Sequence, residues 1–123
     1  MIKCYLEDKT LLVEILSREL DHHVARDVKS EIDEILMKKQ IDYIIFDFQY
    51  VNFMDSSGIG VIIGRYKKIV SHGGKIAVIN MNDRLKKIFN LSGMNKIISM
   101  DENFEYAINS EYDGWTLRRM NIW

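Results

Sequence analysis

Two short segments of nearly continuous apolar residues constrain the fold of this chain more than any other feature. They are YIIFDF at 43–48 and KIAVIN at 75–80. Strands of this composition are covered on both faces, which requires helices on both sides of a largely parallel sheet. The sequence therefore predicts an α/β fold, and 123 residues are enough for a single domain.

The rest of the chain alternates between strand and helix patterns. The segments at 3–6 and 10–16 are expected to pair as a hairpin, and 96–99 to form a last short strand. Apolar residues at helical spacing predict four helices, at 22–39, 57–72, 82–92 and 102–110. Because a hairpin is antiparallel, we expect a mixed, mostly parallel sheet of four to five strands with about four helices.

Composition narrows the classes of function. The chain has 17 basic and 18 acidic residues, so it has no electrostatic footprint for general nucleic-acid binding. Its apolar runs are far shorter than the roughly 20 residues that cross a bilayer, and no segment resembles a signal peptide. Cys4 has no partner for an internal disulfide, and no Cys/His cluster indicates a metal. We expect a cytoplasmic domain that binds neither nucleic acid nor membrane.

The helix predicted over 57–72 has two different sides. On a helical wheel of about 100° per residue, one side is apolar and is expected to face the sheet; its residues are Ile59, Ile62, Ile63, Tyr66, Ile69 and Val70. The other side collects small and polar residues; these are Ser57, Gly60, Val61, Gly64, Lys68 and Ser71.

The glycines on that second side need a reason. Each glycine inside a helix costs about 1 kcal/mol relative to alanine, and the core does not require Gly60 or Gly64 on a solvent-facing surface. We interpret Gly60, Val61, Gly64 and Lys68 as a partner-binding surface, with Val61 as its apolar contact. The alternative is that the glycines allow a close crossing with a neighbouring helix.

Three residues that often cap helices stand together just before this helix. Asp55, Ser56 and Ser57 are all preferred N-cap types, so any one of them could simply cap. With three in a row, one side chain can cap while another stays free. A free hydroxyl at a helix N-terminus favours a phosphate, because unpaired N–H groups and the helix dipole stabilise an anion.

The same segment does not support an enzyme site. Neither serine lies in a Gly-x-Ser-x-Gly elbow, and the glycines of GIGVIIG at 58–64 are spaced one residue too far apart for a dinucleotide-binding fingerprint. No Gly-x-x-x-x-Gly-Lys-Ser/Thr loop for ATP is present. We expect no catalytic residues, and we keep a small nucleotide-binding enzyme as the alternative from another class.

At FMDSSGIGVIIGRYKK, residues 53–68, the chain resembles the STAS-domain anti-sigma factor antagonists, above all those of the stage II sporulation AA type. Further matching segments are ELDHH at 19–23, YIIFDFQYVNFMD at 43–55 and RLKKIFNLSGMNKII at 84–98. The resemblance spans 3–110 and implies the STAS fold.

The resemblance implies a switch controlled by other proteins. The unphosphorylated form would bind an anti-sigma factor that is itself a serine kinase, and so release the sigma factor. Phosphorylation of Ser56 would end that binding, and a serine phosphatase would restore it. ATP or ADP would belong to the kinase, and Asp21, Asp55, Ser57 and Gly58 would surround the phosphorylated residue.

Two features depart from the family pattern. Arg18 stands where relatives usually have glycine, in the loop that presents Asp21. The segment 111–123 extends beyond the STAS domain at 1–110, and its two tryptophans predict that it packs back on the domain. The resemblance leaves open a second possibility, that the chain serves partner switching in another stress or signalling cascade.

Overall fold

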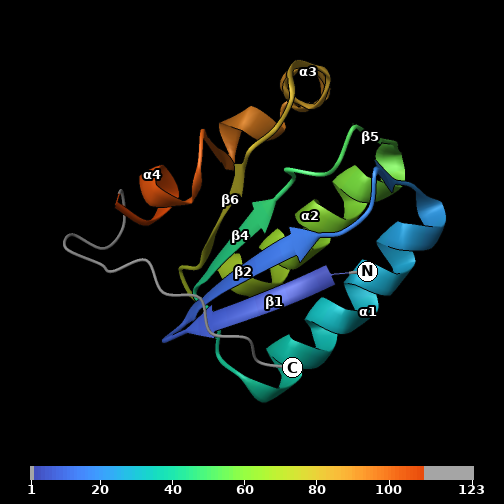
Figure 1. Ribbon diagram of the computed structural model, residues 1–123. Coiled ribbons are helices and arrows are strands. Elements are labelled where there is room, and N and C mark those ends of the chain that lie inside the picture. The colour runs from blue at the N-terminus through green and yellow to red at the C-terminus, as the bar shows by residue number, and fades with distance from the viewer. Residues whose placement is uncertain (1, 110–123) are drawn as a thin grey trace.

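A five-stranded sheet lies at the centre of the structure, a computed structural model that describes residues 2–109 (Figure 1). The strand order is β1-β2-β4-β6-β7, and the β1–β2 pair is antiparallel while the other pairs are parallel. The strands of this sheet are β1 (Ile2–Glu7), β2 (Thr10–Ile15), β4 (Tyr43–Asp47), β6 (Lys75–Ile79) and β7 (Ser99–Asp101). The predicted mixed, mostly parallel α/β sheet is confirmed.

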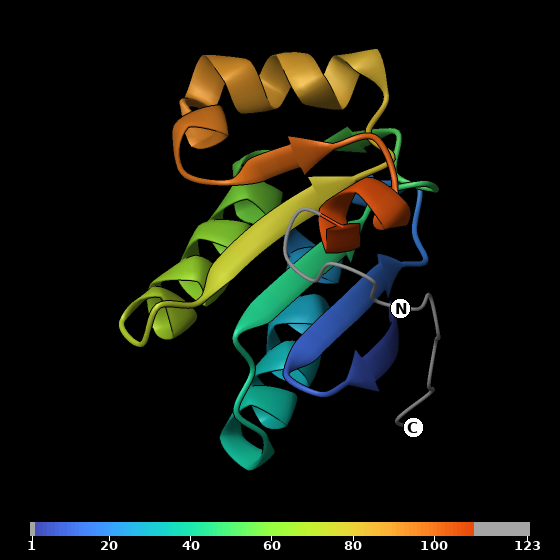
Figure 2. The same cartoon turned by 90° about the vertical axis from the view of Figure 1, so that its left-hand side faces the viewer.

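Helices cover both faces of the sheet (Figure 2). The helices are α1 (His22–Lys38), α2 (Ser56–Val70), α3 (Asp83–Ser92), the 3₁₀ turn η1 (Met94–Lys96) and α4 (Phe104–Asn109). In both views α1 and α2 lie next to each other on one face, and α4 lies on the other. The four helices predicted from periodicity are present among the described residues. The segment 111–123 lies outside them.

The two central strands divide their side chains between two apolar clusters. In β4, Ile44 and Phe46 pack in the cluster beneath α1 and α2, while Tyr43 and Ile45 pack with α4. Strand β6 alternates in the same way, with Val78 towards α1 and α2. Because successive side chains point to opposite faces, a strand buried on both sides reads as the continuous apolar run seen in the sequence.

The prediction of a strand at 96–99 is wrong in its position. Helix α3 ends at Gly93, whose φ of 79° is left-handed, and the chain then enters η1. The N–H groups of Ile97 and Ile98 both donate to the carbonyl of Met94. Ile97 and Ile98, which suggested a strand, therefore belong to this turn, and β7 begins only at Ser99.

Candidate functional site

A second, very small sheet aligns the starts of α1 and α2. Strand β3 (Glu19–Leu20) pairs in parallel with β5 (Phe53–Met54), with Leu20 opposite Met54. The residue after each strand is an aspartate, Asp21 or Asp55, and each aspartate is the N-cap of the helix that follows. The two helices thus begin in the same register, with their N-termini at one end of the molecule.

Both aspartates use their side chains to cap. Asp21 Oδ1 accepts from the N–H of Val24 at 3.1 Å, and Asp55 Oδ1 accepts from the N–H of Ser57 at 2.8 Å. Such caps typically contribute about 1 kcal/mol. Because Asp55 performs this role, neither neighbouring serine is needed as the cap.

The serines differ in exposure. Ser56 is the first residue of α2 and is exposed, and its hydroxyl makes no hydrogen bond within residues 2–109. Ser57 is half-buried and faces a groove between α1 and α2. The expectation that one hydroxyl stays free at this helix start is confirmed for Ser56.

Gly58 fixes the position of the first turn of α2. A Cβ built on Gly58 would lie 3.0 Å from Leu20 Cγ and 3.1 Å from the Leu20 carbonyl oxygen. Gly58 is buried, and a Cβ at this position would be in tight contact with β3, so that Leu20 would have to shift by a few tenths of an ångström. The contact connects the segment that carries Asp21 to the turn that carries Ser56.

Gly60 and Gly64 have open space where a side chain would be. A Cβ built on either glycine has no atom of the described structure within 4 Å, apart from its own local backbone. The alternative of a close helix crossing at these glycines is therefore not observed. They line a groove of about 410 Å³, together with His22, Ala25, Arg26, Lys29, Ser57, Val61 and Arg65.

Val61 does not provide the exposed apolar contact that the sequence predicted. It is only 6% exposed, since α1 packs against this side of α2. Val70, predicted to face the sheet, is 39% exposed. At about 100° per residue, the strip of fully buried residues is centred about a quarter turn from the predicted one, and it includes Val61 and Arg65.

Arg65 is a buried cation that the sequence analysis missed. Its Nε lies 3.1 Å from Oδ1 of Asp33 on α1, and Lys68 Nζ approaches the same oxygen at 3.5 Å. Burial lowers the pKa of the Arg65 guanidinium, and the Asp33 carboxylate opposes that shift. Neither Arg65 Nε nor Asp33 Oδ1 has a hydrogen-bond partner among the described residues. The contact is therefore an ion pair whose geometry does not meet that of a hydrogen bond.

The position of Arg65 among apolar residues of α2 could have indicated its burial from the sequence alone. Arg65 lies three residues after Ile62 and four before Ile69, both of which are buried. A charged residue inside such an apolar stripe indicates a buried ion pair. Lys68, predicted as a partner-binding residue, lies at the same ion pair and remains 51% exposed.

A depression of about 520 Å³ lies next to Asp21. Its lining residues are Ser17, Arg18, Glu19, Asp21, Val24, Asn52, Phe53 and Arg84. The Arg18 carbonyl accepts from the N–H of Asn52 at 2.7 Å. Within residues 2–109 only Asp8 and Asn80, besides glycines, have positive φ, so the backbone at Arg18 does not require the glycine of the family pattern.

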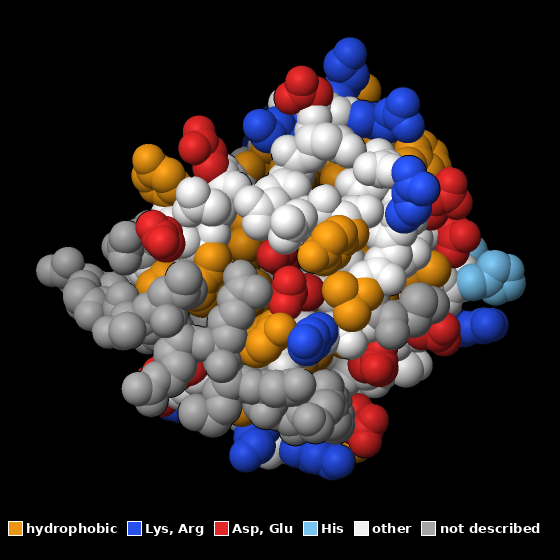
Figure 3. Space-filling model, viewed as in Figure 1, with side chains coloured by type: hydrophobic (Ala, Val, Ile, Leu, Met, Phe, Trp, Pro, Cys, Tyr) orange, Lys and Arg blue, Asp and Glu red, His pale blue; other side chains and the backbone are white. Residues whose placement is uncertain are grey.

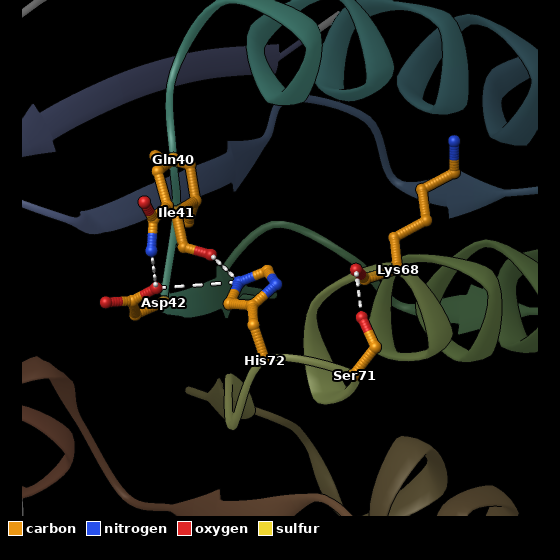
Figure 4. A network of polar contacts seen from close by, with 6 residues as sticks. All are labelled: Gln40, Ile41, Asp42, Lys68, Ser71 and His72. Atoms are coloured by element: carbon orange, nitrogen blue, oxygen red, sulfur yellow. Dashed lines mark hydrogen bonds and ion pairs between the residues drawn. The ribbon is translucent and has the colours of Figure 1, made fainter.

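The far ends of α1 and α2 are joined by a polar network around His72 (Figure 4). His72 Nε2 lies 3.2 Å from the carbonyl oxygen of Ile41 and 3.5 Å from Oδ1 of Asp42. Gln40 Nε2 donates to the same Asp42 oxygen at 3.2 Å. His72 is thus a structural contact distant from the serines.

Neither the face shown in Figure 3 nor the described helices have the features of a nucleic-acid-binding or membrane-spanning protein. Acidic and basic side chains are interspersed on the face shown in Figure 3, with neither sign dominating. None of the helices described here has the length and apolar character needed to cross a membrane.

Sequence comparison identifies a family and a relative. Residues 6–107 match the family model described as the STAS domain. The chain is 40% identical over 93 residues to a protein of Paenibacillus polymyxa named anti-sigma F factor antagonist, covering 76% of this chain and 80% of the relative.

The solved structures that resemble this one include two of SpoIIAA, each with 25% identity and each covering 89% of this chain. The anti-sigma factor antagonist SpoIIAA in its unphosphorylated form matches with a TM-score of 0.78 over 95% of its length. The Bacillus cell fate determinant SpoIIAA in the phosphorylated form matches with a TM-score of 0.70 over 98% of its length.

Proposed function

The chain belongs to the STAS domain family, and from this premise we propose that it is an anti-sigma factor antagonist switched by phosphorylation of Ser56. The unphosphorylated protein binds an anti-sigma factor that is a serine kinase, and so frees the sigma factor. Phosphorylation ends this binding, and a serine phosphatase restores it. The name of the 40% identical relative, anti-sigma F factor antagonist, supports the sigma-F pathway. The resemblance to the stage II sporulation AA type leads us to propose a role in sporulation.

One observation carries this proposal. Ser56 is exposed at the first position of α2, and its hydroxyl is uncommitted within the described chain because Asp55 caps the helix. A kinase can therefore reach the oxygen without unfolding the helix. Ser57 is the weaker candidate because it is half-buried against α1.

A phosphate on Ser56 is expected to leave the fold nearly unchanged. It adds about 1.5 to 2 negative charges, which gain about 0.3 to 1 kcal/mol from an exposed helix N-terminus. Repulsion from Asp55 and Asp21 opposes this gain, and water screens both effects at the surface. The fold of this chain also matches SpoIIAA structures of both the unphosphorylated and the phosphorylated form.

The switch therefore acts at the interface with the partner. A dianion placed in a packed interface without a cation costs several kcal/mol, because desolvation exceeds what the remaining contacts return. Each 1.4 kcal/mol is about a tenfold loss of affinity. Exclusion of the partner by charge and volume, without a large conformational change, is thus sufficient to end binding.

The chain itself acts as a binding protein in this scheme, and it needs no cofactor. ATP and ADP are substrate and product of the kinase partner. Since sigma factors act on transcription, we assign the interaction to the cytoplasm.

The test uses the anti-sigma factor purified from the same organism. It is incubated with this protein and ATP, and the phosphorylated residue is located by mass spectrometry. We expect one phosphate, on Ser56, which Ser56→Ala abolishes and Ser57→Ala retains. Phosphate on Ser57, or no binding between the two purified proteins, contradicts the proposal.

A further inference from the structure

The groove between α1 and α2 is lined by basic side chains that have no role in the proposed phosphorylation of Ser56. Exposed Arg26 and Lys29 of α1 line it, as does buried Arg65 of α2, and none of its lining residues is acidic. On the α2 side, Gly60 and Gly64 leave space for another backbone. The groove is thus open and positively charged.

Arg65 gives the groove a specific requirement for an anion. Its Nη1 is buried and has no hydrogen-bond partner among residues 2–109, and the contact with Asp33 is at Nε. A buried donor without an acceptor is costly, and more so when it carries charge. A carboxylate that entered the groove would reduce this deficit.

The groove is continuous with the proposed modification site. Ser57 belongs to its lining and directly follows Ser56. A protein that reaches the Ser56 hydroxyl therefore also lies against the mouth of the groove. From there Gly60 and Gly64 mark an open strip along α2.

We propose that this groove binds an acidic segment of the same anti-sigma factor, with a carboxylate of the partner lying between Arg26 and Lys29 and directed towards Arg65. This inference rests on the proposed function, and it adds the chemistry by which the partner is held. Glycines at 60 and 64 let the segment approach α2 closely. The lining cations then select an acidic segment over a neutral or basic one.

A carbodiimide cross-link tests the contact directly. The reagent joins a primary amine to a carboxylate that touches it, so Lys29 is expected to couple to an Asp or Glu of the purified anti-sigma factor. Peptide mass spectrometry then identifies both residues. Lys29→Arg keeps the positive charge but has no primary amine, and this link should disappear. The exposed Lys86 of α3 serves as the comparison lysine in the same sample.

Affinity provides the second readout. Arg26→Glu combined with Lys29→Glu should weaken binding of the anti-sigma factor by about tenfold or more and reduce its dependence on salt. Lys86→Glu combined with Lys87→Glu is the matched control on exposed positions of α3, with an expected change below about twofold. Circular dichroism confirms that each variant is folded.

The outcomes separate the two proposals. If the wild-type protein binds and is phosphorylated on Ser56, but the Arg26/Lys29 reversal has no effect, the groove proposal fails and the proposed function stands. A Lys29 link to a second copy of this chain likewise overturns it, in favour of self-association. If the wild-type protein does not bind the anti-sigma factor at all, both proposals fail.

Discussion

The two halves of the paired helices α1 and α2 are built in opposite ways. At the half that begins with Asp21 and Asp55, which we call the serine end, an exposed hydroxyl is followed by two glycines with open space beside them. At the other half, the ion-pair end, side chains bridge the helices: Arg65 reaches Asp33 on α1.

This difference indicates how a small domain can keep a surface free for a partner. The serine end gives up the side chains of two helical positions and so loses helix stability. At the ion-pair end the Arg65–Asp33 contact links α2 to α1, and Ile69 of α2 is buried. Changes at the ion-pair end should therefore mainly affect unfolding, although Arg65 also lines the proposed groove, and changes at the serine end should mainly affect binding.

The strongest test of this division is Arg65→Ala. It opens a cavity beside Asp33 and leaves that carboxylate with only the half-exposed Lys68 as a cation, and removal of one partner of a buried ion pair typically costs about 3 to 5 kcal/mol. Because Asp33 is 22% exposed, we expect about 3 kcal/mol of lost unfolding free energy, measured by urea denaturation.

A second variant separates the loss of the ion pair from the loss of side-chain volume. Asp33→Asn, a substitution of similar size, should destabilise less than Arg65→Ala because it retains a polar acceptor near the guanidinium. Equal stability of Arg65→Ala and the wild type would refute the role assigned to the ion-pair end.

Ser56→Asp should show the reverse pattern. A fixed negative charge at the interface is expected to weaken binding of the anti-sigma factor by about a hundredfold, or about 2.7 kcal/mol. Unfolding free energy should change by less than about 0.5 kcal/mol, since the site is exposed. Isothermal titration calorimetry and urea denaturation measure the two quantities.

Two control variants show whether the effect depends on a negative charge at position 56. Ser56→Ala should retain binding, and Ser30→Asp adds the same charge to an exposed position of α1. If Ser56→Asp binds as well as Ser56→Ala, exclusion by charge is not the mechanism.

A pair of glycine substitutions compares two positions within the serine end. Gly64→Ala should stabilise the domain by about 0.5 to 1 kcal/mol, because helix propensity improves and the added Cβ meets no atom within 4 Å. Gly58→Ala gains the same propensity but places its Cβ 3.0 Å from Leu20 Cγ, so we expect a net loss of about 1 kcal/mol. Thermal unfolding shows whether each variant is more or less stable than the wild type. Stabilisation by both substitutions would show that β3 shifts at little cost to accommodate the added Cβ.

The sequence predicted the elements with strong local signals. The apolar runs of β4 and β6 are readable because a strand covered on both faces has a continuous apolar composition. The two-residue strands β3 and β5 were not predicted, since they are too short for any periodicity. Their pairing is what aligns Asp21 with Asp55.

The candidate site was predictable in part for the same reason. A row of capping residues at 55–57 indicated that one hydroxyl is free, and the structure assigns the cap to Asp55. The helical wheel grouped Val61 with the glycines correctly, but it could not show that α1 covers Val61. Which face of a helix is covered depends on tertiary packing, and periodicity alone does not contain it.

The smallest expected change in stability is that of His72→Ala, just beyond the C-terminus of α2. His72→Ala removes the contacts of Nε2 with the Ile41 carbonyl and with Asp42, but both side chains are more than a third exposed. Exposed contacts of this kind contribute about 0.2 to 1 kcal/mol. We expect a loss near the lower end of that range in urea denaturation, with no change in affinity for the anti-sigma factor. A weakened complex would mean that the partner extends along the whole length of α2, and the boundary between a binding half and a stabilising half would have to move.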